Sequence, residues 1–227
     1  MKRKILVTGG AGFIGSNLVN RLLDDGHDVV VLDSLLRGNK LSPETISRIQ
    51  LVQADVRDGA AMRRAIQGCD MLFHFAAVLG VDVVAQEPVV TMEVEVEGLK
   101  KAVTAALEVS KEKILYDSTS GVYGHGRIED GITEDSPVAP DTSYAIAKRY
   151  NEIYLQSVFQ ETGLQSLSLR FFNIYGANQD NRMVIPRFME MARAGQDITV
   201  FGDGSQTRDF TYIDDALESC IQLMDKV

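Results

Sequence analysis

The sequence contains few cysteines, and it lacks both a long apolar run and a block of basic residues. Its two cysteines, Cys69 and Cys220, are too few for a disulfide framework, and both lie in apolar surroundings. We therefore expect two buried thiols in a reducing compartment. No stretch approaches the ~18 consecutive apolar residues of a membrane span. These absences predict a cytoplasmic protein with no membrane segment.

Charge and histidine content argue against two further kinds of partner. Lys and Arg number 23 against 32 Asp and Glu, which gives a net charge of −9. An acidic chain without a basic block is poorly suited to nucleic acid, because that binding depends on Lys and Arg side chains that displace counterions. The three histidines, His27, His74 and His125, lack the spacing of metal ligands, and no cysteine joins them. We expect neither a nucleic-acid interface nor a metal site.

Apolar runs alternate with amphipathic stretches of helical length along the 227 residues. Near-continuous apolar strands are predicted at 5–7, 29–32, 49–52, 71–75, 113–116 and 164–172. Helices are predicted over 14–23, 60–66, 88–109 and 144–161. Strands that are apolar throughout are typical of a parallel sheet with helices on both faces. The sequence therefore predicts an α/β fold with a doubly wound parallel sheet.

One segment of the predicted helix at 88–109 has an ambiguous pattern. Residues 92–97 alternate between apolar side chains and glutamates, as a strand would. Their place between two predicted strands, and the apolar run that follows, favour a helix. We expect Glu93, Glu95 and Glu97 to form a solvated face rather than an ion site.

The segment from Gly10 to Gly15 matches the pattern G-x-G-x-x-G between a predicted strand and a predicted helix. Glycines there allow a tight turn and a close approach of the backbone to a pyrophosphate, which the helix N-terminus faces. Asp33 closes the next strand, where a carboxylate accepts both ribose hydroxyls of NAD and repels the 2′-phosphate of NADP. The alternative is a glycine-rich turn near a surface carboxylate. Together these features favour an NAD site.

Tyr144 and Lys148 are four residues apart on a predicted helix and share one of its faces. Ser118, Thr119 and Ser120 follow a predicted strand, at the edge where such sheets bind ligands. An ammonium beside a tyrosine favours the phenolate, so the pair can serve as a base. The same spacing also occurs where the tyrosine packs and the lysine is solvated. The pair is informative only together with the glycine loop and the hydroxyl cluster.

Six motifs occur in order along the chain. They read TGGAGFIG at 8–15, HFAA at 74–77, STSGVYG at 118–124, YAIAK at 144–148, RFFN at 170–173 and GDGSQTRDF at 202–210. This set resembles the extended short-chain dehydrogenase/reductase family, specifically its NAD-dependent nucleotide-sugar epimerase/dehydratase branch, and the resemblance covers essentially the whole chain. It implies a Rossmann domain at 1–175 that binds NAD and a small, partial substrate-binding lobe at 176–227.

The resemblance also implies roles for the matching residues. Tyr144 would remove a proton from a sugar hydroxyl, Lys148 would hold the nicotinamide ribose and lower the pKa of that tyrosine, and Thr119 would bind the sugar. Together with the glycine loop and Asp33, it gives the NAD-binding set Gly9, Gly12, Phe13, Ile14, Gly15, Asp33, Asp55, Val56, Ala76, Ala77, Tyr144 and Lys148. The substrate, a nucleotide diphosphate sugar, would contact Ser118, Thr119, Ser120, Asn173 and Arg208. Two alternatives stay open: Asp55 as a turn carboxylate, and Arg208 in a surface pair with Asp203 or Asp209.

The chain departs from the pattern of this family in three places. Gly121 stands where the dehydratases and decarboxylases usually carry an acid, which favours a 4-epimerase over those two. A dehydratase, a decarboxylase or a 4-keto reductase of the same family is the alternative. Val94-Glu95 replaces a segment in which relatives usually carry Asn near the cofactor. Relatives also continue well beyond the position of Val227, so a fragment, a short homologue, or an NAD-binding module with reduced catalysis are further readings. The family also implies a homodimer that pairs through the helices at 88–109 and 144–161.

Overall fold

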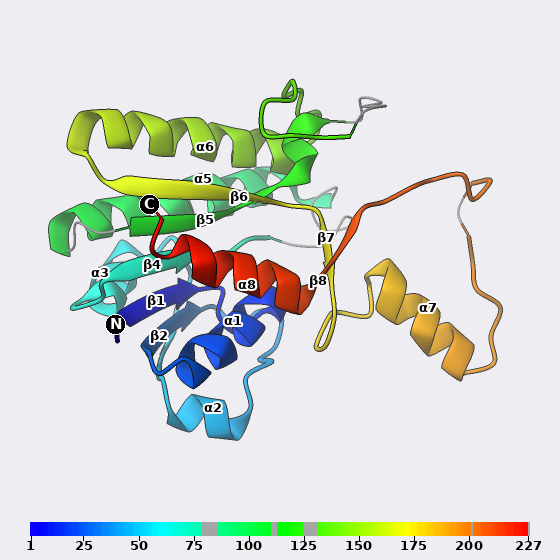
Figure 1. Cartoon of the computed structure of the whole chain (residues 1–227), viewed down its shortest axis with the longest axis horizontal. Helices are drawn as coiled ribbons and strands as arrows, with labels where there is room; N and C mark the ends of the chain where they lie inside the picture. Colours follow the sequence, from blue (N-terminus) through cyan, green and yellow to red (C-terminus); the bar gives the residue numbers. More distant parts are fainter. Residues whose placement is uncertain (79–85, 110–112, 125–130, 201, 227) are drawn as a thin grey trace.

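The computed structural model describes residues 1–78, 86–109, 113–124, 131–200 and 202–226. Six parallel strands form one sheet in the order β3-β2-β1-β4-β5-β6 (Figure 1). Their bounds are β1 Lys4–Thr8, β2 Asp28–Asp33, β3 Gln50–Gln53, β4 Met71–His74, β5 Lys113–Thr119 and β6 Gln165–Phe171. The strand order reverses between β1 and β4, which is the point where doubly wound sheets bind nucleotides. The predicted Rossmann-like α/β fold is confirmed.

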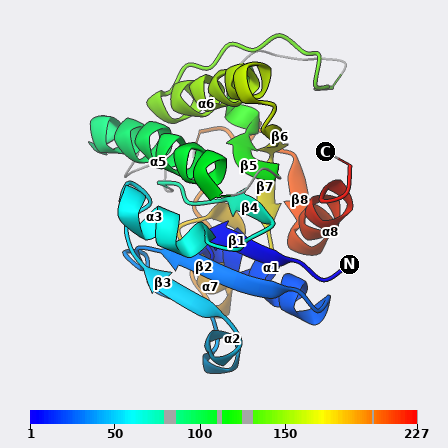
Figure 2. The same ribbon diagram turned by 90° about the vertical axis from the view of Figure 1, so that its left-hand side faces the viewer.

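Helices cover both faces of this sheet (Figure 2). One face carries α1 (Phe13–Asp24) and α8 (Ile213–Leu223), and the other carries α3 (Gly59–Ile66), α5 (Pro88–Val109) and α6 (Ser143–Thr162). The short helix α2 (Pro43–Ser47) and the 3-10 turn η1 (Ser120–Tyr123) lie in connections.

Side chains alternate between the two faces along β1. Ile5 and Val7 pack with α1 and α8, whereas Leu6 packs with α3 and α5. In the sheet Leu6 lies beside Val30 of β2 and Leu72 of β4. Both faces are buried, which is why the strands read as continuous apolar runs rather than as an alternating pattern.

Local sequence signals fix the ends of α3 and α6. The Asp58 carboxylate accepts hydrogen bonds from the first backbone N–H groups of α3, and the Thr142 hydroxyl accepts one at the start of α6. These caps satisfy donors that have no partner within the helix. Gly163 ends α6 in the left-handed conformation, with φ +77°. The cap at Thr142 therefore determines where Tyr144 and Lys148 stand.

The ambiguous segment at 92–97 is helical, as predicted, but the expectation for its glutamates is wrong at one position. Glu93 and Glu97 are exposed, whereas Glu95 is 1% exposed. The reason is the helical period, because Thr91, Glu95 and Leu99 lie on the one stripe of α5 that faces the protein interior.

A second, two-stranded parallel sheet pairs β7 (Asn173–Tyr175) with β8 (Phe210–Tyr212). The chain between them contains α7 (Val184–Arg193), which stands away from the six-stranded sheet in Figure 1. The following helix α8 returns to that sheet, where Ile213 and Leu217 join the core around β1. The division at residue 176 stays a prediction, and α8 belongs physically to the first core.

Both cysteines are free thiols in the interior, as predicted. Burial raises the pKa of Cys69 to about 11 and that of Cys220 to about 12, so both stay protonated near neutral pH. Within the described part of the chain, none of the helices combines the length and the apolar character needed to cross a membrane.

Candidate active site

The loop between β1 and α1 requires glycine at two positions. Gly9 has φ +71°, and a Cβ on it would lie 2.6 Å from the backbone oxygen of Phe75. A Cβ on Gly15 would lie 2.1 Å from the backbone oxygen of Gly9. Among the described residues no side chain caps α1 at Gly12, so the first N–H groups of the helix remain available to an anion. The loop fits the pyrophosphate of a dinucleotide.

Asp33 supports this loop from the end of β2. One of its carboxylate oxygens accepts a hydrogen bond from the backbone N–H of Ala11 (3.0 Å), and the other accepts one from Leu35 (2.8 Å). Each carboxylate oxygen has a second lone pair, so Asp33 can also accept from ribose hydroxyls. Phe13 and Ile14, also predicted to bind NAD, are half-buried in the first turn of α1.

The chain after β4 lies against the glycine loop. Ala76 donates its backbone N–H to the Thr8 hydroxyl (3.3 Å), and the same hydroxyl lies 3.1 Å from Nδ1 of His74. Ala76 and Ala77 are half-buried beside Gly9. The structure thus brings these two predicted cofactor contacts together with the phosphate loop.

Two of the predicted cofactor residues are engaged within the protein. The Asp55 carboxylate pairs with Arg57 at 2.9 and 2.7 Å, and this hydrogen bonding lowers the pKa of Asp55. The Val56 side chain is buried against Gly98 of α5. The geometry of Asp55 matches the turn-carboxylate alternative, and only the backbone of Val56 is left to face a ligand.

Tyr144 and Lys148 meet on α6, as their spacing predicts. The Lys148 ammonium lies 5.4 Å from the centre of the Tyr144 ring. Lys148 is fully buried, whereas Tyr144 is half-buried. The alternative of a solvated lysine is therefore wrong for this chain.

The partners of Lys148 come from α5 and β5. Its ammonium lies 2.5 Å from the backbone oxygen of Asp117, 3.7 Å from that residue's carboxylate and 3.1 Å from the carboxylate of Glu95. Burial opposes the charged lysine, but Glu95 and the other acidic neighbours outweigh it and raise the pKa of Lys148. Burial also raises the pKa of Glu95, and it raises that of Asp117 to about 6. Neither carboxylate was identified from the sequence.

The acid–base balance at Tyr144 differs from the expectation. Burial raises the pKa of Tyr144, and the nearby Lys148 ammonium lowers it by less. The negative charges of Asp117 and Glu95 act in the same direction as burial. Without a bound ligand the phenol is therefore protonated, because burial outweighs the effect of the lysine and the carboxylates add to it.

Thr119 and Gly121 form the turn that faces the start of α6. The Thr119 hydroxyl accepts a hydrogen bond from the backbone N–H of Gly121 (3.1 Å). A Cβ on Gly121 would lie 3.4 Å from both that hydroxyl and the side chain of Ala145. Thr119 and Ser120 are both half-buried, and the Thr119 hydroxyl lies across Gly121 from Ala145, the residue that follows Tyr144.

Ser118 differs from its two neighbours. It is 1% exposed, and its hydroxyl donates a hydrogen bond to Glu152 at 2.6 Å. Arg170 holds the same carboxylate through two hydrogen bonds of 2.9 Å. The Ser118 hydroxyl thus serves an internal network that the sequence did not reveal, and its contact with a substrate stays a prediction.

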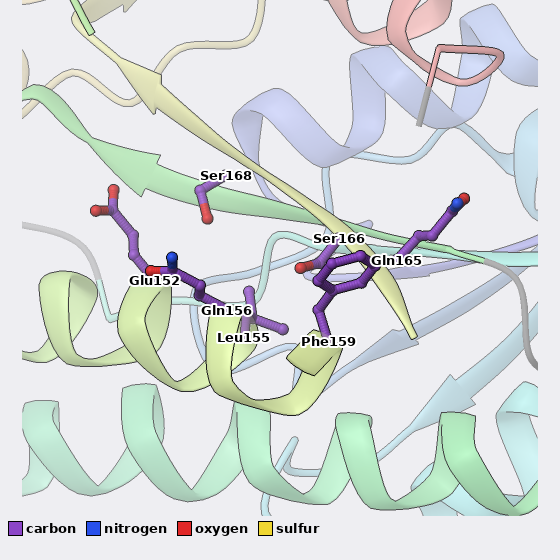
Figure 3. A pocket seen from close by; sticks show the side chains of 7 residues that line it. All are labelled: Glu152, Leu155, Gln156, Phe159, Gln165, Ser166 and Ser168. Carbon is purple, nitrogen blue, oxygen red and sulfur yellow. The ribbon is translucent and has the colours of Figure 1, made fainter. Parts of the chain in front are cut away.

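A pocket of about 370 Å³ lies between α6 and the outer edge of β6 (Figure 3). It is lined by Glu152, Leu155, Gln156, Phe159, Gln165, Ser166 and Ser168. None of these is a predicted site residue. The pocket lies beside the network of Ser118 and is not formed by the glycine loop or by Tyr144.

Asn173 and Arg208 lie on either side of the β7–β8 pairing. The Asn173 side-chain amide donates a hydrogen bond to the backbone oxygen of Asp209 (2.9 Å), which is the residue after Arg208. Arg208 is exposed, and its guanidinium donates to the backbone oxygen of Thr207 (2.7 Å). The small sheet thus brings together two residues predicted to contact the nucleotide diphosphate.

No group of His, Cys, Asp and Glu in the described ranges is arranged to hold a metal ion. His74 is buried, and burial lowers its pKa to about 3, so this imidazole is neutral. His125 lies outside the described residues.

Two relatives carry different chemistry on a similar sequence. The chain is 36% identical to a UDP-N-acetyl-alpha-D-glucosaminuronate decarboxylase of Bacillus cytotoxicus, with 100% of this chain and 72% of the relative covered. It is 35% identical to a UDP-glucose 4-epimerase of Mycolicibacterium smegmatis, with 96% and 72% covered.

A solved structure agrees over the same span. The UDP-glucose 4-epimerase of Thermus thermophilus in complex with NAD superposes with a TM-score of 0.90 at 32% identity, covering 99% of this chain and 75% of that one. The profile of the NAD dependent epimerase/dehydratase family matches residues 5–227. With a glycine loop and an Asp33 carboxylate that fit NAD, the chain belongs to this family of NAD-dependent enzymes.

Proposed function

We propose that the protein is a 4-epimerase of a nucleotide diphosphate sugar, with UDP as the nucleotide. Gly121 is the observation that carries the proposal. A dehydratase needs a carboxyl group for the leaving hydroxyl, and its relatives usually place one at this position. Here the turn offers a Thr119 hydroxyl beside a glycine, and Asp117 and Glu95 are engaged with Lys148. Epimerisation requires no such acid.

The site residues divide the proton chemistry among them. Tyr144 removes the proton of the sugar 4-hydroxyl, Thr119 holds that hydroxyl, and Lys148 stabilises the phenolate that Tyr144 must become. NAD, when bound, supplies the hydride acceptor and donor for carbon 4. The 4-keto sugar would turn over within the site so that its opposite face meets the cofactor, and Tyr144 would give the proton back to the oxygen on carbon 4. The sugar is inverted at one carbon with no net oxidation.

Other residues of the site would bind NAD and the diphosphate of the sugar nucleotide. The N–H groups of Phe13 and Ile14 would hold the pyrophosphate of NAD, and Asp33 would hold its adenosine ribose. Asn173 and Arg208 take the diphosphate of the sugar nucleotide. An exposed guanidinium next to a side-chain amide is suited to a diphosphate.

A decarboxylase is the second candidate, because the relative at 36% identity is one. Its first step, oxidation at carbon 4, would use the same Tyr144, so only the product separates the two reactions. A catalytically reduced NAD-binding module is the candidate from another class. It is favoured if replacement of Tyr144 changes nothing measurable.

We also propose a homodimer formed through α5 and α6. These two helices pack side by side, and their outer surfaces expose apolar side chains that no described part of the chain covers. They include Val89, Met92, Leu107, Ile146 and Ile153. Two such helix pairs would bury these residues in a four-helix contact.

Proton NMR and mass spectrometry on the protein, with added NAD and a panel of UDP-sugars, test the proposal. An epimerase yields a product of unchanged mass with a new anomeric signal. Loss of carbon dioxide from a UDP-linked uronic acid would identify the second candidate. NAD binding without any turnover would favour the module.

A further inference from the structure

Glu95 is a buried carboxylate with both oxygens engaged. One oxygen accepts a hydrogen bond from the backbone N–H of Val78 (3.1 Å), and the other lies 3.1 Å from the Lys148 ammonium. Its own backbone oxygen accepts from the side-chain amide of Asn151 (3.0 Å). A charge that is removed from water persists only with such partners. Glu95 is therefore held in one position by its hydrogen bond to Val78 and its ion pair with Lys148.

The two partners of this carboxylate belong to different parts of the proposed cofactor site. Val78 directly follows Ala76 and Ala77, which lie against the phosphate loop. Lys148 belongs to the helix that carries Tyr144. A single side chain thus joins the chain segment that lines the cofactor to the cation beside the proposed base.

The charge around Tyr144 is unbalanced toward the negative. Glu95 on α5, and Tyr116 and Asp117 on β5, act on the Tyr144 phenol, while Lys148 stands on its own helix. His74 on β4 stacks on Tyr116 and lies near Lys148. His74 is neutral and the buried Tyr116 is protonated, so two carboxyl groups oppose one ammonium. An amide at position 95 would leave the same geometry with one negative charge fewer.

We propose that Glu95 is a positioning residue: it fixes Lys148 against the cofactor-lining segment, and its negative charge sets the pH range in which Tyr144 acts as a base. The effect on the pH range of Tyr144 rests on the proposed function, whereas the fixing of Lys148 does not.

Glu95→Gln, compared with Glu97→Gln, tests the charge. Glu97 lies two residues further along α5 and is exposed, so its replacement removes the same charge outside the site. In the pH profile of kcat/KM, we expect the rising limb of Glu95→Gln to move down by about one pH unit, with Glu97→Gln unchanged. Coincident profiles for all three proteins would overturn the role of the charge. If Tyr144→Phe is as active as the parent, the proposed function fails instead.

A titration without substrate or cofactor tests the contact with Lys148. In protein labelled with ¹³C at the lysine ε-carbons, the Lys148 signal is assigned by its loss in Lys148→Met. Glu95→Gln removes the nearest counter-charge from a buried ammonium, so this signal should titrate at lower pH than in the parent. An unshifted titration contradicts the contact.

A stability cycle covers the case in which Glu95→Gln folds poorly. The double variant Glu95→Gln/Lys148→Met removes both charges, and we expect it to melt at a higher temperature than Glu95→Gln alone. If the loss of stability in the double variant equals the sum of the losses in Glu95→Gln and Lys148→Met, the two side chains are not coupled.

Discussion

The Lys148 ammonium lies 3.1 Å from a Glu95 carboxylate oxygen, and both side chains are shielded from solvent. The lysine beside the proposed base is therefore not an isolated cation. Part of its effect on Tyr144 is offset by its own partner, and burial keeps the phenol protonated. Without ligands the Tyr144 phenol thus keeps its proton, and bound ligands must lower its pKa before it can act as a base.

Tyr144→Phe should remove turnover while the fold and NAD binding persist. The change deletes only the hydroxyl that accepts and returns the sugar proton, a contribution of about 10²–10⁴ in rate. Initial rates and calorimetric NAD binding measure the two effects separately. Tyr150→Phe is the matched control, since Tyr150 stands exposed on the same helix. Equal loss in both variants would point to α6 as a whole rather than to the phenol.

Gly15→Ala should weaken both NAD binding and the fold. The new Cβ would lie 2.1 Å from the backbone oxygen of Gly9, so the phosphate loop must shift. We expect a loss of about 1–3 kcal/mol in unfolding free energy, measured by urea denaturation, and a higher Kd for NAD. Gly59→Ala is the control, because its Cβ would meet the flexible side chains of Lys101, at 3.3 Å, and Arg63, at 3.7 Å. Unchanged NAD affinity in Gly15→Ala would show that the loop does not contact the cofactor.

Glu152→Gln should cost stability at neutral pH and much less in acid. Burial raises the pKa of Glu152, but hydrogen bonds from Arg170, Ser118 and Arg149 outweigh it, so the folded pKa is lowered. A lowered carboxyl pKa contributes stability above the unfolded value of 4.5, and this contribution is lost as pH falls through the folded value.

Urea midpoints of the parent and of Glu152→Gln between pH 7 and pH 3 measure this difference. We expect a gap of about 3–5 kcal/mol at pH 7, since one member of a buried pair is removed, and a narrower gap at pH 3. Glu161→Gln, at the exposed end of α6, should show no gap. A gap that does not depend on pH would assign the loss to packing instead of charge.

Ile153→Glu should convert the proposed dimer to a monomer. Ile153 is 49% exposed on the outer surface of α6, and a charge at the centre of an apolar contact opposes association. Light scattering coupled to size-exclusion chromatography measures the mass. Leu36→Glu, at an 83% exposed position after β2, is the control. If Ile153→Glu and the parent have the same mass, the contact lies elsewhere or does not form.

The strands, helices and glycine loop could be predicted from the sequence, whereas the positions of the buried charged side chains could not. The apolar strands, the helix over 88–109 and the glycine loop follow from periodicity and from motifs that act locally, and the structure places them as expected. The prediction that Glu95 shares a solvated face with Glu93 and Glu97 is wrong, because residues two apart on a helix do not share a face. The helical period of Thr91, Glu95 and Leu99 was the available signal.

Other parts of the site depend on contacts between distant segments. Ser118 and Glu152 are 34 residues apart, and only the packing of β5 against α6 reveals that the serine hydroxyl is engaged. The elevated pKa of Tyr144 likewise follows from burial and from carboxylates on α5 and β5. Motif spacing gave the pairing of Tyr144 with Lys148 but could not give the charge that surrounds it.

The most direct test of the account follows a single hydrogen. UDP-glucose deuterated at carbon 4 is incubated with the protein and NAD, and the sugar product is examined by NMR and mass spectrometry. The account predicts a 4-epimer of unchanged mass that keeps its deuterium at carbon 4, because the hydride leaves and returns within one site. An epimer that has lost the deuterium to solvent, or a product that has lost water, would contradict it.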